Sequence, residues 1–135
     1  HGEAGIPLYE HLVYSCDATY EAAREALLSH PEWLDEIDGV FAQADVMALG
    51  VLAALRELGR DVPPALPLVG YDDIRMAAIA HPRLTTVHQP QEELARVACT
   101  HLVDLLQGRA APDPIAITLE PHLVVRGSAP PVEGS

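Results

Sequence analysis

The side chains best placed to do chemistry are two adjacent aspartates, Asp72 and Asp73, which follow the apolar run 66–70. A carboxylate pair can serve acid–base catalysis or hold a metal ion. Neighbouring residues at a strand end point in opposite directions, however, so these two carboxylates do not converge on one ion. Asp72 lies where ligands of open α/β sheets bind, and we expect it to contact a ligand. The alternative for Asp72 is a cap for the next helix, and we expect Asp73 to cap or to face solvent.

Several catalytic and cofactor motifs are missing from the sequence. It holds no GxGxxG, GxxxxGK[ST], GxSxG or HExxH, the patterns of dinucleotide sites, phosphate loops, nucleophile elbows and zinc proteases. The histidines show no i, i+4 pair, and Cys16 and Cys99 belong to no CxxC pattern, so a disulfide between them is an open but minor alternative. We expect no enzyme, no metal site and no cofactor.

Composition limits the partners of this chain. Its 135 residues carry a formal charge of −12, and all eight of its fixed cations are arginines. Duplex affinity comes largely from cations that neutralise phosphates, so we expect no direct DNA binding by this piece. No apolar run reaches the roughly 18 residues of a membrane span. The chain begins at His1 rather than at a methionine, so we expect a fragment. Because it shows neither such a run nor a charged-then-apolar leader, we expect it to be soluble and cytoplasmic.

Apolar runs and capping residues predict alternating strands and helices. The expected strands are residues 12–16, 39–42 and 66–70, with late strand-like runs at 115–119 and 123–126. The expected helices are residues 20–29, 46–58, about 74–79, and 91–107. Thr19 and Asp45 suit helix N-caps, and Gly59 suits a left-handed position after a helix. This order predicts an α/β, Rossmann-like parallel sheet with helices on both faces.

Five blocks of sequence occur in one order along the chain. They are FAQADVMALG at 41–50, LRELG at 55–59, LVGYDDI at 68–74, PRLTTVHQP at 82–90 and PHLVVRGS at 121–128. In order and spacing they resemble the LacI/GalR family of bacterial transcription regulators, from about residue 5 to residue 128. Each block alone is weak evidence, and the five together make a specific match.

The resemblance implies a fold like the periplasmic sugar-binding proteins, with two Rossmann-like subdomains around a cleft. Residues 1–84 and 120–128 would then form the C-terminal effector-binding subdomain. Residues 85–119 would cross over and contribute a helix mainly to an N-terminal subdomain that is missing here. Residues 129–135, rich in proline, glycine and serine, would form a flexible tail.

The resemblance also implies a set of effector-binding positions. Asp72 matches the aspartate that hydrogen-bonds the effector in the family, and Asp45 would be first a helix cap and second a wall of the cleft. Ala44 stands where the family often has asparagine, serine or threonine, and Ala18 where several members have an aromatic ring. These departures leave the effector class in doubt, although a sugar is the family's commonest choice.

The helix expected at 46–58 carries more apolar surface than one face needs. The family places one face on the sheet and the other in a two-fold dimer, which assigns Met47, Leu49 and Leu52 to a dimer interface. The alternative is a helix buried on both sides.

Taken together, these features predict an effector-sensing and dimerisation module of a LacI-type regulator. A small molecule, expected to be a carbohydrate, would bind in the cleft and control DNA binding by a helix-turn-helix domain that this chain lacks. The apolar stripe of the 91–107 helix would be uncovered without the N-terminal subdomain, so we expect a homodimer or a swapped oligomer. The alternative is an extracytoplasmic solute-binding protein of the same fold.

Overall fold

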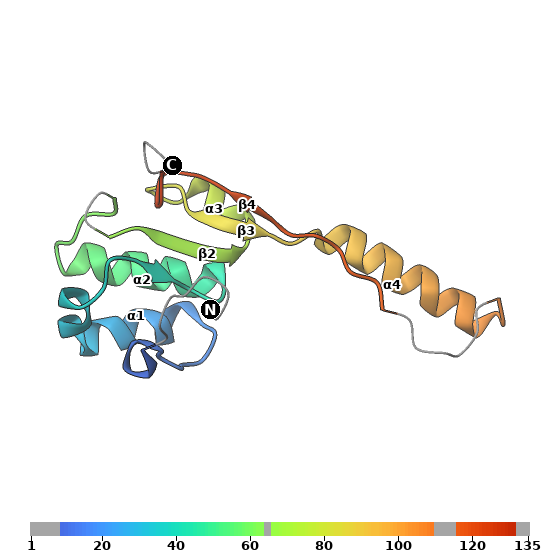
Figure 1. Cartoon of the computed structure of the whole chain (residues 1–135), viewed down its shortest axis with the longest axis horizontal. Helices are drawn as coiled ribbons and strands as arrows, with labels where there is room; N and C mark the ends of the chain where they lie inside the picture. The colour runs from blue at the N-terminus through green and yellow to red at the C-terminus, as the bar shows by residue number, and fades with distance from the viewer. Residues whose placement is uncertain (1–8, 64–65, 110–115, 132–135) are drawn as a thin grey trace.

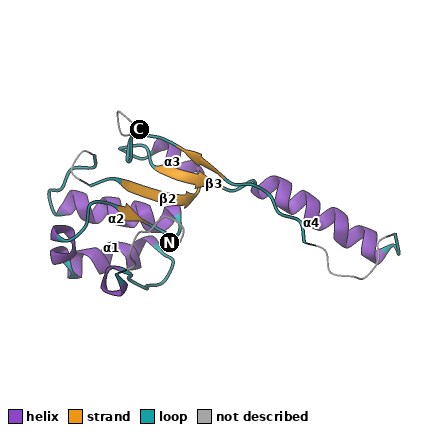
Figure 2. Ribbon diagram, in the orientation of Figure 1, coloured by secondary structure: helices purple, strands orange, loops and turns teal. Residues whose placement is uncertain are grey.

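Four short strands form one sheet with helices packed on it, and one long helix stands apart from this body (Figures 1 and 2). The computed structural model describes residues 9–63, 66–109 and 116–131. The strands are β1 (Val40–Phe41), β2 (Leu68–Asp72), β3 (Thr85–His88) and β4 (His122–Val124). The helices are α1 (Tyr20–Ser29), α2 (Asp45–Glu57), α3 (Arg75–Ile79) and α4 (Gln91–Leu106), with 3₁₀ turns η1 (Glu10–Leu12) and η2 (Pro31–Asp35).

The sheet is parallel over its first three strands and ends with an antiparallel fourth. Its order is β1-β2-β3-β4, with Val69 opposite Thr85 in the parallel part and Val87 opposite Leu123 in the antiparallel part. Helix α2 connects β1 to β2, and α3 connects β2 to β3. The predicted α/β fold, a parallel sheet with flanking helices, is confirmed.

Most of the predicted helix boundaries agree with the structure, and the caps explain them. The Thr19 side chain accepts from the Ala22 amide at 3.1 Å, which starts α1 as predicted. Gly59 has a φ of +68° just beyond α2, the left-handed conformation predicted for it. The predicted capping by Asp45 is wrong, because Ala44 occupies the cap position and Asp45 is the first helical residue.

Residues 12–16 do not form the predicted strand. Leu12 ends η1, and residues 13–17 run without a strand partner in the described part of the chain. A cavity of about 740 Å³, lined by Val13 and Tyr14 on one side and by Val40 and Phe41 on the other, separates them from β1. An extended segment joins a sheet only within hydrogen-bonding reach of a neighbour, about 4.8 Å between strands, and the cavity prevents this.

Two further differences concern the later strands. Residues 116–119 of the run predicted at 115–119 form no strand, and Ile115 lies outside the described residues. Residues 85–88 of the segment expected to cross over form an inner strand of the sheet, β3, and the crossover itself stays a prediction. The sheet therefore extends through residue 88, and the assignment of the residues beyond it to a second subdomain stays a prediction.

Helix α2 is the central element of the core. Leu52 and Ala48 pack with Leu68 and Leu84 against the sheet. On its other side α2 meets α1, where the Arg24 guanidinium and the Glu57 carboxylate form a two-point ion pair at 2.7 and 2.5 Å. Burial on both sides explains why α2 is apolar around most of its surface.

This packing bears on the predicted dimer residues. Leu52 is 7% exposed and lies in the core of this chain, and Met47 is half-buried against the same cluster. Leu49 is half-buried as well. The role of Met47, Leu49 and Leu52 in a dimer stays a prediction, and Leu52 has the least exposed surface of the three to offer it.

Helix α4 projects from the body as an arm, connected to it by the segments that follow β3 and precede β4 (Figure 1). None of its residues is buried, and Leu94, Leu102 and Leu106 are 51%, 56% and 79% exposed. Its apolar stripe therefore lies open along its length. None of the described helices has the length and apolar character needed to cross a membrane.

Gly50 allows α1 and α2 to approach closely, which gives a first prediction. A Cβ at this position would overlap the Tyr20 carbonyl oxygen, which belongs to the backbone and cannot move aside alone. We expect Gly50→Ala to lower the free energy of unfolding by about 1–3 kcal/mol, the usual cost of overpacking. Urea unfolding followed by circular dichroism measures this. Gly127→Ala is the control, because its added Cβ would meet its nearest atom at an ordinary 3.4 Å. Equal stability of the two variants would show that the helices can separate freely.

Candidate functional site

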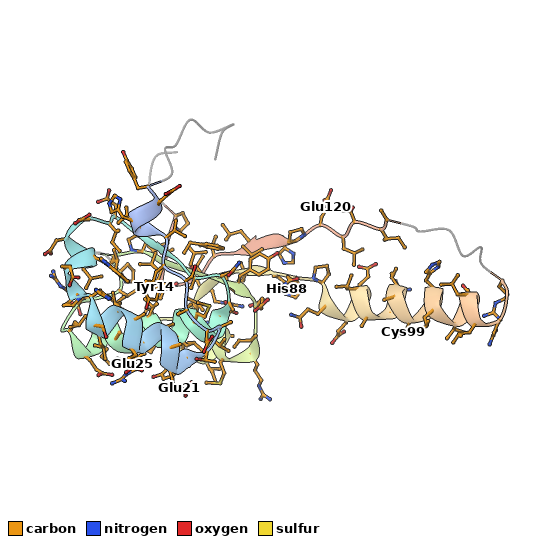
Figure 3. The ribbon with its side chains drawn as sticks, turned by 90° about the horizontal axis from the view of Figure 1, so that it is seen from below. Tyr14, Glu21, Glu25, His88, Cys99 and Glu120 are labelled. Atoms are coloured by element: carbon orange, nitrogen blue, oxygen red, sulfur yellow. The ribbon has the colours of Figure 1, made fainter. Side chains whose placement is uncertain are left out.

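The parallel strands deliver polar side chains to one edge of the sheet. Asp45 follows β1, Asp72 ends β2, and Gln89 comes directly after β3. The carboxyl ends of parallel strands lie side by side, and this edge is where open α/β sheets bind ligands. The same edge leads to the α4 arm, as the position of His88 between the body and α4 shows (Figure 3).

Asp72 is held in an unusual backbone conformation. Its φ is +112°, in the region that residues with a Cβ rarely adopt, and Asp73 follows at +56°. The Gln89 side-chain amide donates to the Asp72 carboxylate, with 2.6 Å between Nε2 and Oδ1. Asp72 is half-buried. Its carboxylate has a second oxygen, an acceptor of the kind that a ligand hydroxyl or N–H would use.

Sequence reasoning missed Gln89 as a site residue. The register of β2 and β3 places Asp72 beside His88, so the residue after His88 comes level with the end of β2. The signal was available in the block TTVHQP, where an alternating run ends in a polar residue. The strand at 85–88 was not among the predicted strands, so its end was not considered as a site position.

Asp73 is an ion-pair partner rather than the predicted cap or solvent-facing residue. Its carboxylate accepts from the Arg126 guanidinium at 2.6 Å and lies 3.0 Å from His88 Nδ1. Burial alone would raise the pKa of Asp73, but the hydrogen bonds from Arg126 and His88 outweigh it and hold this pKa below its ordinary value. The ionised carboxylate therefore joins β3 to the residues that follow β4.

Asp45 is fully buried and anchors three elements at once. Its Oδ1 accepts from the Thr86 hydroxyl at 2.6 Å, and its Oδ2 accepts from the Ile74 amide at 2.9 Å. The Thr86 hydroxyl in turn accepts from the Asp73 amide at 3.4 Å. Burial raises the pKa of Asp45, and the two hydrogen bonds oppose that rise. Asp45 therefore acts here as a buried positioning group for the turn that carries Asp72.

Gly70 makes room for this carboxylate. A Cβ on Gly70 would overlap Asp45 Oδ1 and press on Leu84. The glycine in the block LVGYDD is thus explained by the close approach of the buried carboxylate to β2.

The two alanine positions contribute small, apolar surface. Ala44 is half-buried at the start of α2, and Ala18 is exposed two residues before α1. A small hollow of about 120 Å³ lies beside Gln89 at the base of the arm. Its lining residues are Tyr71, Gln89, Pro90, Leu94, Leu119 and Pro121. Gln89, the hydrogen-bond partner of Asp72, is the polar amide side chain in this otherwise largely apolar lining. Contact of Asp72, Asp45, Ala44 or Ala18 with an effector stays a prediction.

Histidine and cysteine side chains were the other candidates for chemistry. The His88 and His122 rings lie 4.8 Å apart across β3 and β4. Among residues 9–63, 66–109 and 116–131, no three His, Cys, Asp or Glu side chains are grouped as a metal would require. Cys16 and Cys99 are both free thiols in this structure, and Cys99 lies on the exposed arm (Figure 3).

Known proteins match this chain over nearly its whole length. The family model described as a periplasmic binding protein-like domain matches residues 2–129. The HTH-type transcriptional regulator CelR of Thermobifida fusca is 39% identical over 125 residues, 93% of this chain and 36% of CelR. The HTH-type transcriptional repressor PurR of Yersinia pestis bv. Antiqua is 36% identical over 126 residues, 93% of this chain and 37% of PurR. The chain therefore spans little more than a third of these relatives.

Solved structures give the same result. A complex of the regulator CelR with cellobiose superposes with a TM-score of 0.87 at 38% identity, covering 94% of this chain and 38% of that one. A LacI family regulator from Arthrobacter sp. FB24 in complex with lactose gives 0.75 at 39% identity, covering 82% of this chain and 42% of that one. The relatives are LacI-type regulators, as the five sequence blocks predicted.

The buried carboxylate of Asp45 gives a second prediction. Asp45→Ala removes both acceptors and leaves the Thr86 hydroxyl and the Ile74 amide without a partner in the interior. We expect the free energy of unfolding to fall by about 2–4 kcal/mol, since each buried unsatisfied group costs about 1–3 kcal/mol. Chemical denaturation measures the loss. Asp35→Ala, at an aspartate whose side chain is 75% exposed, is the control and should change stability by less than about 0.5 kcal/mol. Similar losses in both variants would refute the anchoring role.

The ion pairs of Asp73 give a third prediction, on pH. A carboxylate whose folded-state pKa is depressed stabilises the fold above its unfolded pKa, about 3.9. This contribution is lost as pH falls through the folded-state value. We expect Asp73→Asn to lower stability at pH 7 by about 1–3 kcal/mol and to flatten the loss of stability below pH 4. Denaturation curves from pH 7 to pH 3 measure both effects, and parallel curves for parent and variant would contradict the assignment.

Proposed function

The chain belongs to the periplasmic binding protein-like family, and from that premise we propose that it is the effector-sensing part of a LacI-type transcription regulator. The observation that carries this proposal is the strained, half-buried Asp72, which lies at the carboxyl edge of the sheet. The structure of CelR with cellobiose, which superposes on 94% of this chain, supports the same module.

We propose a carbohydrate as the effector. Asp72 supplies an acceptor for a sugar hydroxyl, and Gln89, already bonded to Asp72, supplies a second polar group beside it. The alanines at 18 and 44 leave space that larger side chains would fill. Cellobiose and lactose in the two solved relatives support this class of ligand.

The response to the effector follows from where the site lies. Asp72 and Gln89 join the body to the root of the α4 arm, so a ligand that competes for the Asp72 carboxylate changes how the arm is held. Such a ligand shifts the equilibrium between arm positions only by its difference in affinity for them. In a complete regulator this shift would control a DNA-binding domain, in the cytoplasm and in a dimer. The acidic balance of this chain supports placing the DNA contacts elsewhere.

The relatives favour a regulator over an extracytoplasmic solute-binding protein. Both curated relatives are named as HTH-type regulators of transcription. Their names also give no support to a catalytic role, and we assign no reaction to this chain.

Asp72→Ala gives a fourth prediction. The test uses a chimera in which this chain replaces the matching 125 residues of CelR, so that the site is complete. Losing one charge-assisted hydrogen bond costs about 1.5–3 kcal/mol, so sugar affinity should fall roughly ten- to hundred-fold. Calorimetric titration with cellobiose and with lactose measures it, and Asp35→Ala in the same chimera should bind as the parent does.

The outcomes separate the parts of the proposal. A chimera that binds neither sugar contradicts a carbohydrate effector. Binding that is unchanged in Asp72→Ala shows that Asp72 only shapes the turn.

A further inference from the structure

We propose that His88 and His122 form a binding site for a divalent transition-metal ion such as Zn²⁺, which would join β3 to β4 at the root of the α4 arm. The ion would be held by one imidazole nitrogen from each strand. The inference uses other side chains than the effector site and does not depend on the proposed function.

The sheet brings the two histidines together. They lie directly opposite each other in the antiparallel pair of β3 and β4. Directly opposite residues project from the same face, with Cβ atoms about 4.5–5.5 Å apart. Their ring centroids lie 4.8 Å apart, and the ring planes are tilted by 39°.

This spacing suits a single ion held between the rings. Two Zn–N bonds of about 2.0–2.1 Å at a tetrahedral angle separate the two nitrogens by roughly 3.3 Å. His122 is exposed, so its ring can turn until one of its nitrogens comes this close to the ring of His88. Both imidazoles can then bind one ion while the strands stay in register.

Asp73 fixes which nitrogen of His88 is free. The Arg126 guanidinium donates to the Asp73 carboxylate at 2.6 Å, and the hydrogen bonds on this carboxylate hold its pKa low. An ionised carboxylate only accepts hydrogen bonds, so the His88 Nδ1 that lies 3.0 Å from Asp73 Oδ2 carries a proton. The neutral ring therefore has its lone pair on Nε2.

A carboxylate behind the ring is also the usual outer partner of a metal-binding histidine. It orients the imidazole and raises its basicity. The alternative for His88 and His122 is an aromatic contact across the strands with no ligand. Such packing is indifferent to which ring nitrogen is free, whereas a metal requires the free Nε2 that Asp73 leaves on His88.

Access and charge indicate the class of ion. The His88 side chain is 37% exposed, and the chain has a formal charge of −12, which favours cations near its surface. Imidazole nitrogen suits Zn²⁺, Cu²⁺ and Ni²⁺, whereas Mg²⁺ and Ca²⁺ prefer oxygen. The described residues supply no third protein ligand here, so water would fill the other positions and binding would be reversible.

The position of the pair gives a bound ion a structural effect. β3 leads toward the arm and β4 follows the segment that returns from it, with His88 between the body and α4 (Figure 3). An ion shared by the two histidines would clasp the strands where the arm begins. We therefore expect zinc to slow amide hydrogen exchange in β3 and β4.

Zinc titration tests the proposal on this chain, made without a polyhistidine tag, at pH 7.5, where an ordinary imidazole is neutral. Calorimetry should give one high-affinity Zn²⁺ per chain. NMR spectra of the histidine rings should show the His88 and His122 signals shifting together during the titration. Mg²⁺ is the control ion and should produce neither effect, since it prefers oxygen ligands.

A matched pair of variants tests the ligands. His122→Phe keeps a ring opposite His88 and removes the nitrogen. We expect it to weaken zinc binding at least roughly tenfold, since even the loss of an outer-shell partner costs about 10- to 100-fold. His101→Phe, on α4, is the control and should bind zinc as the parent does. Circular dichroism checks that both variants are folded.

Four results would overturn the proposal. The first is a chain that binds no zinc, and the second is zinc affinity that His122→Phe leaves unchanged. The third is a titration in which the rings of other histidines shift and those of His88 and His122 do not. The fourth is zinc binding that occurs only together with dimerisation in sedimentation, which would mean that the ion bridges two copies.

Discussion

The buried Asp45 carboxylate is the interaction on which the rest of the site depends. One side chain bonds the hydroxyl of Thr86 in β3 and the amide of Ile74 after β2, and its own backbone begins α2. A charge in the interior is retained only when its oxygens are satisfied, so the three elements must meet in one arrangement. Asp72 and Asp73, the two non-glycine residues with positive φ, lie at the end of β2 directly before Ile74, close to the bonds that Asp45 makes.

A second polar cluster fixes the opposite end of the inner strands. The Ser128 hydroxyl donates to Leu68 O and accepts from the Thr85 amide, and the Thr85 hydroxyl accepts from the Arg126 amide. Thr85, Thr86 and Ser128 are nearly or fully buried. Neighbouring side chains on a strand point to opposite faces, so Thr85 joins this cluster while Thr86 joins Asp45 on the other face of the sheet. These bonds hold the final segment of the chain against β2 and β3.

Local signals predicted the helices and the inner strands well, because caps and apolar periodicity act within a few residues. Thr19 and Gly59 are cases in which the chemistry of one residue ends or begins a helix. The predictions failed where the structure of a segment depends on contacts with residues far away in the sequence. Residues 12–16 have the composition of a strand, but no neighbouring strand lies within pairing reach of them. Asp45 is a residue type that often caps helices, but its side chain bonds instead to Thr86, 41 residues away. The pair of Asp72 and Gln89 likewise follows from register, which no local pattern gives.

The attachment of the α4 arm through two adjacent chains has a mechanical consequence. The arm leaves the body beside the antiparallel pair of His88 and His122, and the segment that leads into β4 runs beside the segment that leaves β3 (Figure 1). Two parallel tethers resist splaying within their common plane, because that would stretch one and compress the other. They resist twist about their long axis far less. The compliant coordinate of this molecule is therefore torsion of the arm, and a torque applied to α4 reaches the sheet as shear between β3 and β4.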